Sequence, residues 1–472
     1  MQKLTKIVAT ISDRRCDVEF IHSLFKAGMN VARINTAHAD FEATRQMIKN
    51  IRQVSNTIAV LIDTKGPEIR TGAVDEPFDV TEGEKIAFIG DTQKNCVPGT
   101  IYVNHPGFEN EIPIGTKILI DDGDIAFEAS ELCDGKLICK VLNSGKIKSR
   151  KSVNVPGVHI KLPSLSDKDR KFIQLAIEED VTFIAHSFVR NKEDVICIQK
   201  ILDQNKSKIK IIAKIENQQG VDNIKEILQH AYGIMIARGD LGIEIPAERI
   251  PAIQKELNRI AIEHLKPVIV ATQMLHSMIN NPRPTRAEVS DVANAIYDGA
   301  DAVMLSGETA SGNYPVEAVK TMSKIALEVE HIKDKLKDNI HPVQSKSEIS
   351  EFLAKTAVHA SVELDAAAII ADSFSGNTIR NLAAYRGIKP IYAICYNEHV
   401  IRELALSYGV YPQIMRIHKS ADDFIQSAVS LVLNKQFVEI DDKVVLLAGS
   451  FGKGNSATLL EINSCDNLVK RY

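Results

Sequence analysis

The stretch KIKIIAKIENQQGVDNIKEILQHAYGIMIARGD (208–240) contains the pattern on which the fold of this chain depends. Two short, mostly apolar runs, KIKIIAKI (208–215) and YGIMIA (232–237), enclose an amphipathic segment of helical character. Such runs are typical of parallel strands buried on both faces. Polar residues stand where the runs end, namely Lys214 and Glu216 for the first and Arg238 and Asp240 for the second. The stretch therefore predicts a β-α-β unit with charged carboxyl ends.

The same unit recurs on both sides of this stretch. Six further apolar runs alternate with amphipathic segments: KIVATI (6–11), NVARINT (30–36), IAVLIDT (58–64), TFIAHSFV (182–189), PVIVAT (267–272) and ADAVMLS (300–306). Without residues 67–157, the eight runs and the helical segments between and after them form a core of roughly 240 residues, close to the roughly 250 of a typical (β/α)8 barrel. A doubly wound sheet is the alternative, but eight nearly regular units favour the barrel. The predicted fold class is therefore α/β, with a (β/α)8 TIM barrel.

Residues 67–157 interrupt this alternation. Their short alternating runs, such as KIAFIG (85–90), are separated by Gly, Asp and Asn turns and predict an inserted all-β lid. Beyond a charged linker at 331–348, strands and helices alternate again. The expected domains are a barrel built from 1–66 and 158–335, an inserted β lid domain at 67–157 and a C-terminal α/β regulatory domain at 336–472.

The composition narrows the classes of partner. The net charge is −4, from 57 basic and 61 acidic residues, so there is no electrostatic case for nucleic acid or an anionic membrane. The seven cysteines include no C-x-x-C pair, which argues against a disulfide framework or a zinc site. No apolar run reaches the roughly 20 residues of a membrane span, and the first residues lack a signal-peptide pattern. We therefore expect a cytoplasmic protein.

The carboxyl ends of the predicted strands are unusually polar, and in a barrel the active site lies there. Two carboxylates from neighbouring strands, Glu216 and Asp240, suit a hard cation such as Mg²⁺. Lys214 faces the same way as Glu216 on its strand and can neutralise charge on a transferring phosphoryl group. Ordinary ion pairs among these residues are the alternative. Other polar strand ends are Arg33, Asn35, Asp63, Thr64, Lys65, Thr272, Ser306 and Glu308.

Several long motifs resemble the pyruvate kinase family. They are TKGPEIRTG (64–72), KIENQQG (214–220), ARGDLGIEIP (237–246), ATQMLHSM (271–278), RPTRAEVSDVANA (283–295) and DGADAVMLSGETA (298–310). They follow in the family's order through the barrel, and the likeness continues more loosely into the C-terminal domain. The resemblance implies a phosphotransferase, dependent on Mg²⁺ or Mn²⁺, that passes the phosphoryl group of phosphoenolpyruvate to ADP. The products would be pyruvate and ATP, in the last step of glycolysis.

The resemblance also assigns roles to the residues at the centre of the site. Lys214 would contact the transferring phosphoryl group, and Arg33 would grip its oxygens. Glu216 and Asp240 would ligate the divalent metal. Thr272 would lie near the route by which the enolate is protonated. The substrate carboxylate would be held by Gly239, Asp240 and Thr272.

A monovalent cation and a nucleotide are implied in the same way. K⁺ is assigned to Asn35, Asp63 and Thr64, with Glu68 marking the potassium-using branch. The family usually reads N-F-S-H-G where this chain reads NTAHA (35–39), so Ala37 replaces a serine ligand and water would stand in its place. A second departure, ATISD (9–13) for the family's C-T-I-G-P, lies on the nucleotide side. ADP or ATP is assigned to Asn35, His38, Arg70 and Lys151, and a solvated basic run is the alternative for Lys151.

The C-terminal domain carries two candidate phosphate cradles, at 373–378 and 452–457. Hydroxyls and N–H groups at a helix start favour anions, and the family binds sugar-phosphate or nucleotide effectors in this domain. Ordinary helix capping by Ser375 or Thr378 is the alternative. The predicted effector residues are Ser373, Ser375, Gly376 and Thr378. The resemblance further implies a homotetramer.

Two other functions remain open from the sequence. One is a metal-dependent barrel enzyme acting on a pyruvyl substrate, such as an aldolase or a mutase-like lyase, which would not need a lid facing a nucleotide. The other is a catalytically silent protein that binds phosphorylated metabolites. Such a protein would not need Lys214, Glu216 and Asp240 together.

Overall fold

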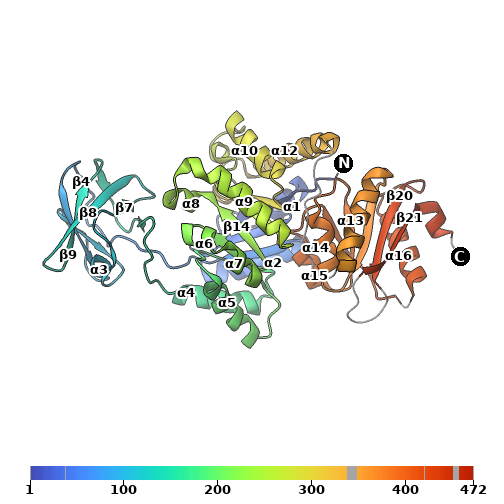
Figure 1. Ribbon diagram of the computed structural model, residues 1–472, viewed down its shortest axis with the longest axis horizontal. Helices are drawn as coiled ribbons and strands as arrows, with labels where there is room; N and C mark the ends of the chain where they lie inside the picture. The colour runs from blue at the N-terminus through green and yellow to red at the C-terminus, as the bar shows by residue number, and fades with distance from the viewer. Residues whose placement is uncertain (1, 38, 337–347, 419, 450–456, 471–472) are drawn as a thin grey trace.

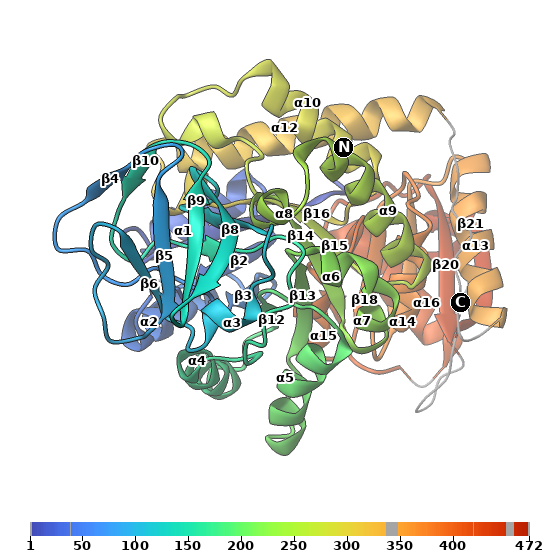
Figure 2. The same cartoon turned by 60° about the vertical axis from the view of Figure 1, so that its left-hand side comes forward.

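A computed structural model describes residues 2–37, 39–336, 348–418, 420–449 and 457–470 of the chain. In Figure 1 three bodies follow one another along the long axis: a small β domain, a central barrel and a C-terminal domain. The view in Figure 2 brings the small β domain forward, over one end of the barrel. The C-terminal domain packs at the opposite end of the barrel.

Eight parallel strands close into the barrel, as the sequence predicts. Their order around it is β1-β16-β15-β14-β13-β12-β3-β2, so each strand pairs with its neighbour in the chain and β16 closes on β1. The insertion lies between β3 and β12. The strands are β1 (Lys6–Ile11), β2 (Val31–Asn35), β3 (Ala59–Asp63), β12 (Phe183–His186), β13 (Lys210–Ile215), β14 (Gly233–Ala237), β15 (Val268–Ala271) and β16 (Ala302–Leu305).

The alternation of side chains along β13 explains how the strand presents its polar end. Ile211, Ala213 and Ile215 belong to the apolar layer between strands and helices, whereas Ile212 belongs to the barrel interior. Successive residues of a strand point to opposite faces. Lys214 therefore lies on the inner side with Ile212, one step nearer the carboxyl end, and Glu216 follows on that side.

Helices cover the outside of the barrel. The helix α1 illustrates how they are delimited, because the side chain of Asp17 accepts a hydrogen bond from Phe20 N, and Gly28 ends the helix with a φ of 120° that favours glycine. The covering helices are α1 (Val18–Ala27), α2 (Phe41–Val54), α4 (Asp167–Glu178), α5 (Lys192–Gln204), α7 (Ile224–His230), α9 (Ile250–Glu263), α10 (Arg286–Tyr297) and α12 (Pro315–Leu336). Shorter helices follow three strands: α6 (Gln218–Asp222), α8 (Arg238–Glu244) and α11 (Gly307–Ala310).

The inserted domain is a β structure with its own apolar core. Six strands form one sheet in the order β11-β7-β8-β9-β5-β6, and β10 pairs with β4. All pairs in it are antiparallel except β5 with β6. The elements are β4 (Phe78–Val80), β5 (Lys85–Gly90), β6 (Thr100–Val103), α3 (Phe108–Glu111), β7 (Lys117–Ile120), β8 (Ile125–Cys133), β9 (Lys136–Val141), β10 (Gly145–Ile147) and β11 (Val153–Asn154).

The C-terminal domain has a five-stranded sheet in the order β19-β18-β17-β20-β21, of which β21 is antiparallel. The apolar run QIMRI (413–417) predicts a strand, but the strand in the structure, β19, begins earlier, and the sequence predicts no strand at β21. The expected linker is partly helical, because α12 continues to Leu336; residues 337–347 lie outside the described part. The elements are α13 (Glu348–Glu363), β17 (Ala368–Ser373), α14 (Asn377–Ala384), β18 (Ile391–Cys395), α15 (Glu398–Leu404), β19 (Val410–Ile414), α16 (Ala421–Asn434), β20 (Lys443–Gly449), β21 (Ala457–Ser464) and α17 (Cys465–Val469).

Buried polar contacts join the C-terminal domain to the barrel. Arg386 Nη2 lies 2.6 Å from Asp301 Oδ2, and both side chains are buried. Lys6 Nζ donates to the carbonyl of Val410 over 2.6 Å, and burial lowers the pKa of this lysine to about 7. At these contacts, the barrel and the C-terminal domain are therefore joined by polar groups that are buried from solvent. In the described part of the chain, no helix is both long and apolar enough to cross a membrane.

Candidate active site

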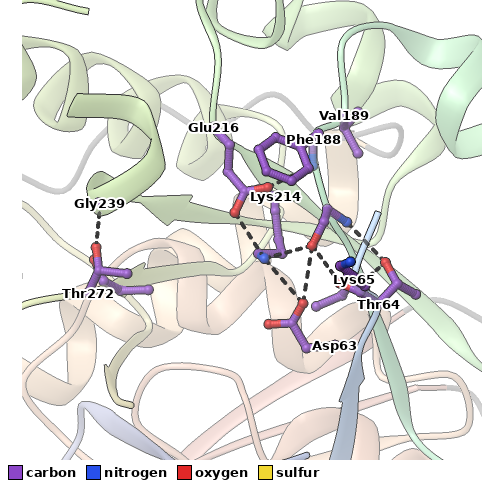
Figure 3. Close-up of polar contacts among 12 residues, drawn as sticks. Asp63, Thr64, Lys65, Phe188, Val189, Lys214, Glu216, Gly239 and Thr272 are labelled. Atoms are coloured by element: carbon purple, nitrogen blue, oxygen red, sulfur yellow. Dashed lines mark hydrogen bonds and ion pairs between the residues drawn. The ribbon is translucent and has the colours of Figure 1, made fainter. Parts of the chain in front are cut away.

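Four of the predicted site residues form one chain of alternating charge at the carboxyl ends of the barrel strands. Figure 3 shows three of them, Asp63, Lys214 and Glu216. Arg33 Nε lies 2.7 Å from Asp63 Oδ2, whose other oxygen lies 3.2 Å from Lys214 Nζ. Lys214 Nζ in turn lies 2.9 Å from Glu216 Oε1. The exposed fraction is 8% for Arg33 and 9% for Lys214, and it is 1% for each of the two carboxylates, Asp63 and Glu216. Two cations are thus held in place by two carboxylates that are almost wholly desolvated.

Ser187, just after β12, completes the surroundings of Lys214. Its hydroxyl accepts a hydrogen bond from Lys214 Nζ over 2.7 Å and donates to the carbonyl of Thr64 over 2.7 Å. The next residue, Phe188, has a φ of 55° and donates its backbone N–H to Glu216 Oε2 over 2.7 Å. Sequence reasoning missed both residues. The sequence gives only a weak indication of their roles, because Ser187 is one of many serines and its contact with Lys214 arises only when β12 and β13 lie side by side.

Burial and neighbouring charges set the protonation of these groups. Burial opposes the charged form of Asp63, but Lys214 and Arg33 outweigh it and hold the pKa of this carboxyl below its usual range. Burial likewise opposes the charge on Lys214, yet Asp63 and Glu216 raise its pKa. For Glu216, burial dominates and raises the pKa to about 8, although Lys214 lowers it. Lys214 is therefore a fixed cation, whereas the charge of Glu216 lacks full compensation.

The surroundings of Glu216 fit a metal cation. Its Oε1 atom is buried, contacts Lys214 and accepts no hydrogen bond of good geometry. Glu216 and Asp240 line the same cavity of about 150 Å³ between the lid and the barrel. Within the described residues no group of three or more His, Cys, Asp or Glu side chains could hold a metal. The two carboxylates would therefore need substrate or water oxygens to complete a coordination shell, which is how proteins commonly hold Mg²⁺.

A strained turn after β15 places Thr272 beside the start of α8. Thr272 has a φ of 70°, a costly conformation for a β-branched residue. Its hydroxyl accepts the N–H of Gly239 over 2.8 Å, and Arg238 Nη2 donates to its carbonyl over 2.8 Å. Arg238 is itself held by both oxygens of Asp291, at 2.6 and 2.7 Å. Figure 3 shows the Thr272–Gly239 contact to one side of the Lys214 cluster. The sequence pointed to Thr272 and Gly239 but not to the Arg238–Asp291 support.

Comparison with known proteins shows the family of the chain. The barrel domain model of pyruvate kinase matches residues 2–319, and the alpha/beta domain model of pyruvate kinase matches residues 351–462. The chain belongs to the pyruvate kinase family. A pyruvate kinase of Borreliella burgdorferi is 46% identical over 100% of this chain and 99% of its own length. One of Bacillus licheniformis is 43% identical over 99% of this chain and 81% of its own length.

A solved structure agrees with this family and with the three-part fold. A pyruvate kinase from Cryptosporidium parvum has a TM-score of 0.92 and 36% identity, and the match covers 98% of this chain and 96% of that one. The chain is thus a phosphotransferase enzyme of the pyruvate kinase family. The remaining predicted site residues can be placed on this frame.

The residues expected to hold K⁺ in this pyruvate kinase family member lie on adjacent strands. Asn35 and Asp63 are paired in the register of β2 and β3. Asn35 Oδ1 accepts the N–H of Ala37 over 3.1 Å. Thr64 Oγ1 accepts the N–H of Ser187 over 3.2 Å, so this hydroxyl faces the same cluster as Lys214. The structure therefore places Asn35 and Thr64 next to Asp63, which is itself part of the row of charges.

The two lid cations are engaged within the lid. Two nitrogens of the Arg70 guanidinium contact Glu68, with Nε 2.8 Å from Oε2 and Nη2 2.9 Å from Oε1, and Nη1 donates to the carbonyl of Arg150 over 2.8 Å. Lys151 Nζ lies 2.9 Å from Asp121 Oδ1. The ion pair of Lys151 is partly exposed, so both the nucleotide role and the surface alternative stay predictions. His38, also expected to touch nucleotide, lies outside the described residues.

The predicted effector residues surround the start of α14. The Ser373 hydroxyl accepts the N–H of Gly376 over 2.8 Å, and Gly376 has a φ of 80°. No side chain caps α14, so the alternative of capping by Ser375 or Thr378 is wrong. Gly376 occupies the position before the helix and offers no side-chain oxygen. The second predicted cradle, at 452–457, lies outside the described residues apart from its last residue.

Proposed function

We propose that this enzyme transfers the phosphoryl group of phosphoenolpyruvate to ADP and releases pyruvate and ATP. The observation that carries the proposal is the buried row of charges Arg33–Asp63–Lys214–Glu216, whose last member, Glu216, lines the cavity under the lid together with Asp240. Phosphoryl transfer needs little covalent help from a protein; it needs positioning and stabilisation of spreading negative charge. A desolvated cation whose pKa is raised supplies that stabilisation without reorganisation.

In this mechanism the residues of the active site have separate tasks. Arg33 and Lys214 hold the phosphoryl oxygens while the bond between phosphorus and the enol oxygen breaks. An oxygen of the terminal phosphate of ADP forms the new bond to phosphorus. The Gly239 and Asp240 backbone and the Thr272 hydroxyl hold the substrate carboxylate. The enolate that remains takes a proton on its methylene carbon, and Thr272 lies on the proton's route.

Glu216 and Asp240 would hold Mg²⁺, or Mn²⁺ in its place. When bound, this ion polarises the carboxylate and enol oxygens of the substrate and offsets the negative charge of the leaving enolate. The same ion would compensate the buried charge of Glu216. Asn35, Asp63 and Thr64 would hold K⁺, and a water would stand where Ala37 leaves out a hydroxyl.

The lid would close over ADP or ATP. Arg70 and Lys151 would bind its phosphates and exchange their present partners, Glu68 and Asp121, for the nucleotide. Asn35 and His38 would also contact the nucleotide. A closed lid excludes water and so favours transfer over hydrolysis. We keep the domain limits expected from the sequence as part of the proposal. They are 1–66 with 158–335 for the barrel, 67–157 for the lid and 336–472 for the C-terminal domain.

The proposal also covers the regulation and the assembly of the enzyme. A sugar phosphate or a nucleotide would bind at Ser373, Ser375, Gly376 and Thr378 and act as an allosteric effector. The active form would be a cytoplasmic homotetramer without a nucleic-acid or membrane partner.

Omission assays with the full-length enzyme test the proposal. Pyruvate formation should require phosphoenolpyruvate, ADP and Mg²⁺ together, and K⁺ should raise it. Pyruvate release without nucleotide would favour the aldolase or lyase alternative. Metabolite binding without any pyruvate release would favour the catalytically silent alternative.

A further inference from the structure

A polar cavity lies between the C-terminal domain and the end of the barrel opposite the lid. Its volume is about 430 Å³. The barrel contributes the loop before β12 and the loop before β13, and the C-terminal domain contributes α15, which Figure 1 places at the junction of the two bodies. The charged and ring side chains that line it are Asp180, Lys206, Lys208, Glu398, His399 and Arg402.

Two buried side chains of this cavity have polar atoms without a partner. Arg402 and His399 are each 6% exposed. Arg402 Nη2 contacts Asp180, but Nε has no hydrogen bond and Nη1 comes only within 4.0 Å of Glu398. His399 Nε2 donates to the carbonyl of Lys208 over 3.0 Å and lies 3.3 Å from Glu403 Oε1. Its Nδ1, at 3.8 Å from Asp180, then carries a lone pair and makes no hydrogen bond. The Nε–H of Arg402 is therefore a buried donor without an acceptor, which costs free energy unless a ligand supplies the acceptor.

The cavity also has an excess of positive charge. Lys206 and Lys208 form no ion pair with any described residue, so Asp180 and Glu398 are the acidic lining residues that face them and Arg402. Arg52 approaches from α2, donates to the carbonyl of Asp180 over 3.2 Å and makes no ion pair within the described chain. Burial and the charge of Arg402 lower the pKa of Arg52. Among the lining residues, three cations against two carboxylates leave a net positive charge, which suits an anion.

We propose that this interdomain cavity binds a phosphate-type dianion, either inorganic phosphate or the phosphomonoester of a small metabolite. Arg402 donates to the ligand from the buried floor of the cavity, and Lys206 and Lys208 cover the ligand from the barrel side. Guanidinium groups are well suited to phosphate because their planar donors match its oxygens. The volume leaves room for a carbon skeleton beside the phosphate. The site lies in a different place from the effector residues at α14.

Occupation would tie the C-terminal domain to two active-site strands. The loop carrying Lys206 and Lys208 leads into β13, whose other end carries Lys214 and Glu216. The loop carrying Asp180 leads into β12, which is followed by Ser187. A ligand that bridges these loops to α15 stabilises the junction. We therefore expect ligand binding to slow local opening there.

Hydrogen exchange of the full-length enzyme tests the site directly. Amides of residues 205–210 and 397–404 should be protected at least tenfold by saturating inorganic phosphate or glycerol phosphate, relative to chloride of equal ionic strength. Amides of α16 serve as the internal reference for general salt effects. Protection by one compound alone identifies the source of the dianion and still supports the site.

Charge removal gives the second half of the test. K206Q/K208Q should weaken the apparent affinity at least tenfold, because two of the cations are lost. The matched control K200Q/K225Q removes two exposed lysines from neighbouring helices and should respond like the wild type. The proposal is overturned if neither compound protects the two segments, or if K206Q/K208Q responds unchanged. Either result leaves the omission assays for phosphoryl transfer unaffected.

Discussion

At the scale of single residues, the site depends on how Lys214 is held rather than on its charge alone. Asp63, Glu216 and Ser187 surround its ammonium at 3.2, 2.9 and 2.7 Å. A mobile lysine would present the same charge, but its reorganisation would cost part of the rate. The hydroxyl of Ser187 is the one uncharged member of this set.

Replacing Ser187 by alanine should therefore lower kcat roughly ten- to a hundredfold, because small misplacements at a reacting centre carry penalties of that size. KM for phosphoenolpyruvate should change much less. Steady-state kinetics measure both constants. S187T, which keeps the hydroxyl, is the matched variant and should retain more activity than S187A; equal activity of S187A and wild type would contradict the positioning role.

The sequence could predict most of the charged residues of the site but not how they pair. Lys214, Glu216, Asp63 and Arg33 end predicted strands, and barrel geometry brings strand ends together. Ser187 and Phe188 escaped because their roles arise between strands, through a hydroxyl and a backbone N–H. Whether a water replaces the hydroxyl missing at Ala37 depends on a K⁺ site that remains a prediction.

At the scale of elements, the turn after β15 and the start of α8 act as one unit. Arg238 joins them, because its guanidinium contacts Asp291 through two bonds and the Thr272 carbonyl through a third. This support holds Thr272 at its strained φ. Strain of this kind persists only where the surroundings over-determine it.

We expect R238K to release this turn. Lysine cannot reproduce the planar fork, so the contacts to Asp291 and Thr272 cannot all be kept. The free energy of unfolding should fall by about 1–3 kcal/mol, and kcat should fall about tenfold or more. Urea unfolding and steady-state kinetics measure the two effects.

R259K is the matched control for that variant. Arg259 contacts Glu263 on the exposed face of α9, and the same substitution there should leave both quantities close to those of the wild type. If R238K behaves like R259K, the Arg238 contacts do not position Thr272.

The elements of the barrel were easier to predict than those of the C-terminal domain. Barrel strands are buried on both faces and read as apolar runs, whereas β19 contains Pro412 and is only partly buried, so its limits shift. The edge strand β21 follows glycine-rich sequence and has a mostly half-buried pattern without clear alternation. The strand pairs antiparallel with β20, and its own sequence pattern does not indicate this pairing.

At the scale of the whole molecule, buried charges join the barrel to the C-terminal domain. Asp301 accepts hydrogen bonds from Arg386 and from the backbone of Val268 and Tyr408, so it links β15, the start of β16 and the segment after α15. Buried ion pairs need not stabilise a fold relative to apolar residues, but removing one partner leaves an uncompensated charge.

R386M should therefore lower the free energy of unfolding by about 3–5 kcal/mol, and the double variant R386M/D301N should recover part of that loss. Equilibrium urea unfolding of the full-length chain measures both. The same loss in R386M and R386M/D301N would show that the stranded charge of Asp301 is not the cause.

The most direct test of the whole account is the turnover of K214M beside K210M. Both lysines lie on β13, but Lys214 faces the charge chain, whereas Lys210 lies at the other end of the strand, 3.5 Å from Glu403. With circular dichroism confirming a native fold, K214M should lose pyruvate formation from phosphoenolpyruvate and ADP by at least a thousandfold, about 4 kcal/mol of transition-state stabilisation. K210M should stay within a few fold of the wild type. Normal turnover by folded K214M would contradict the assignment of the active site.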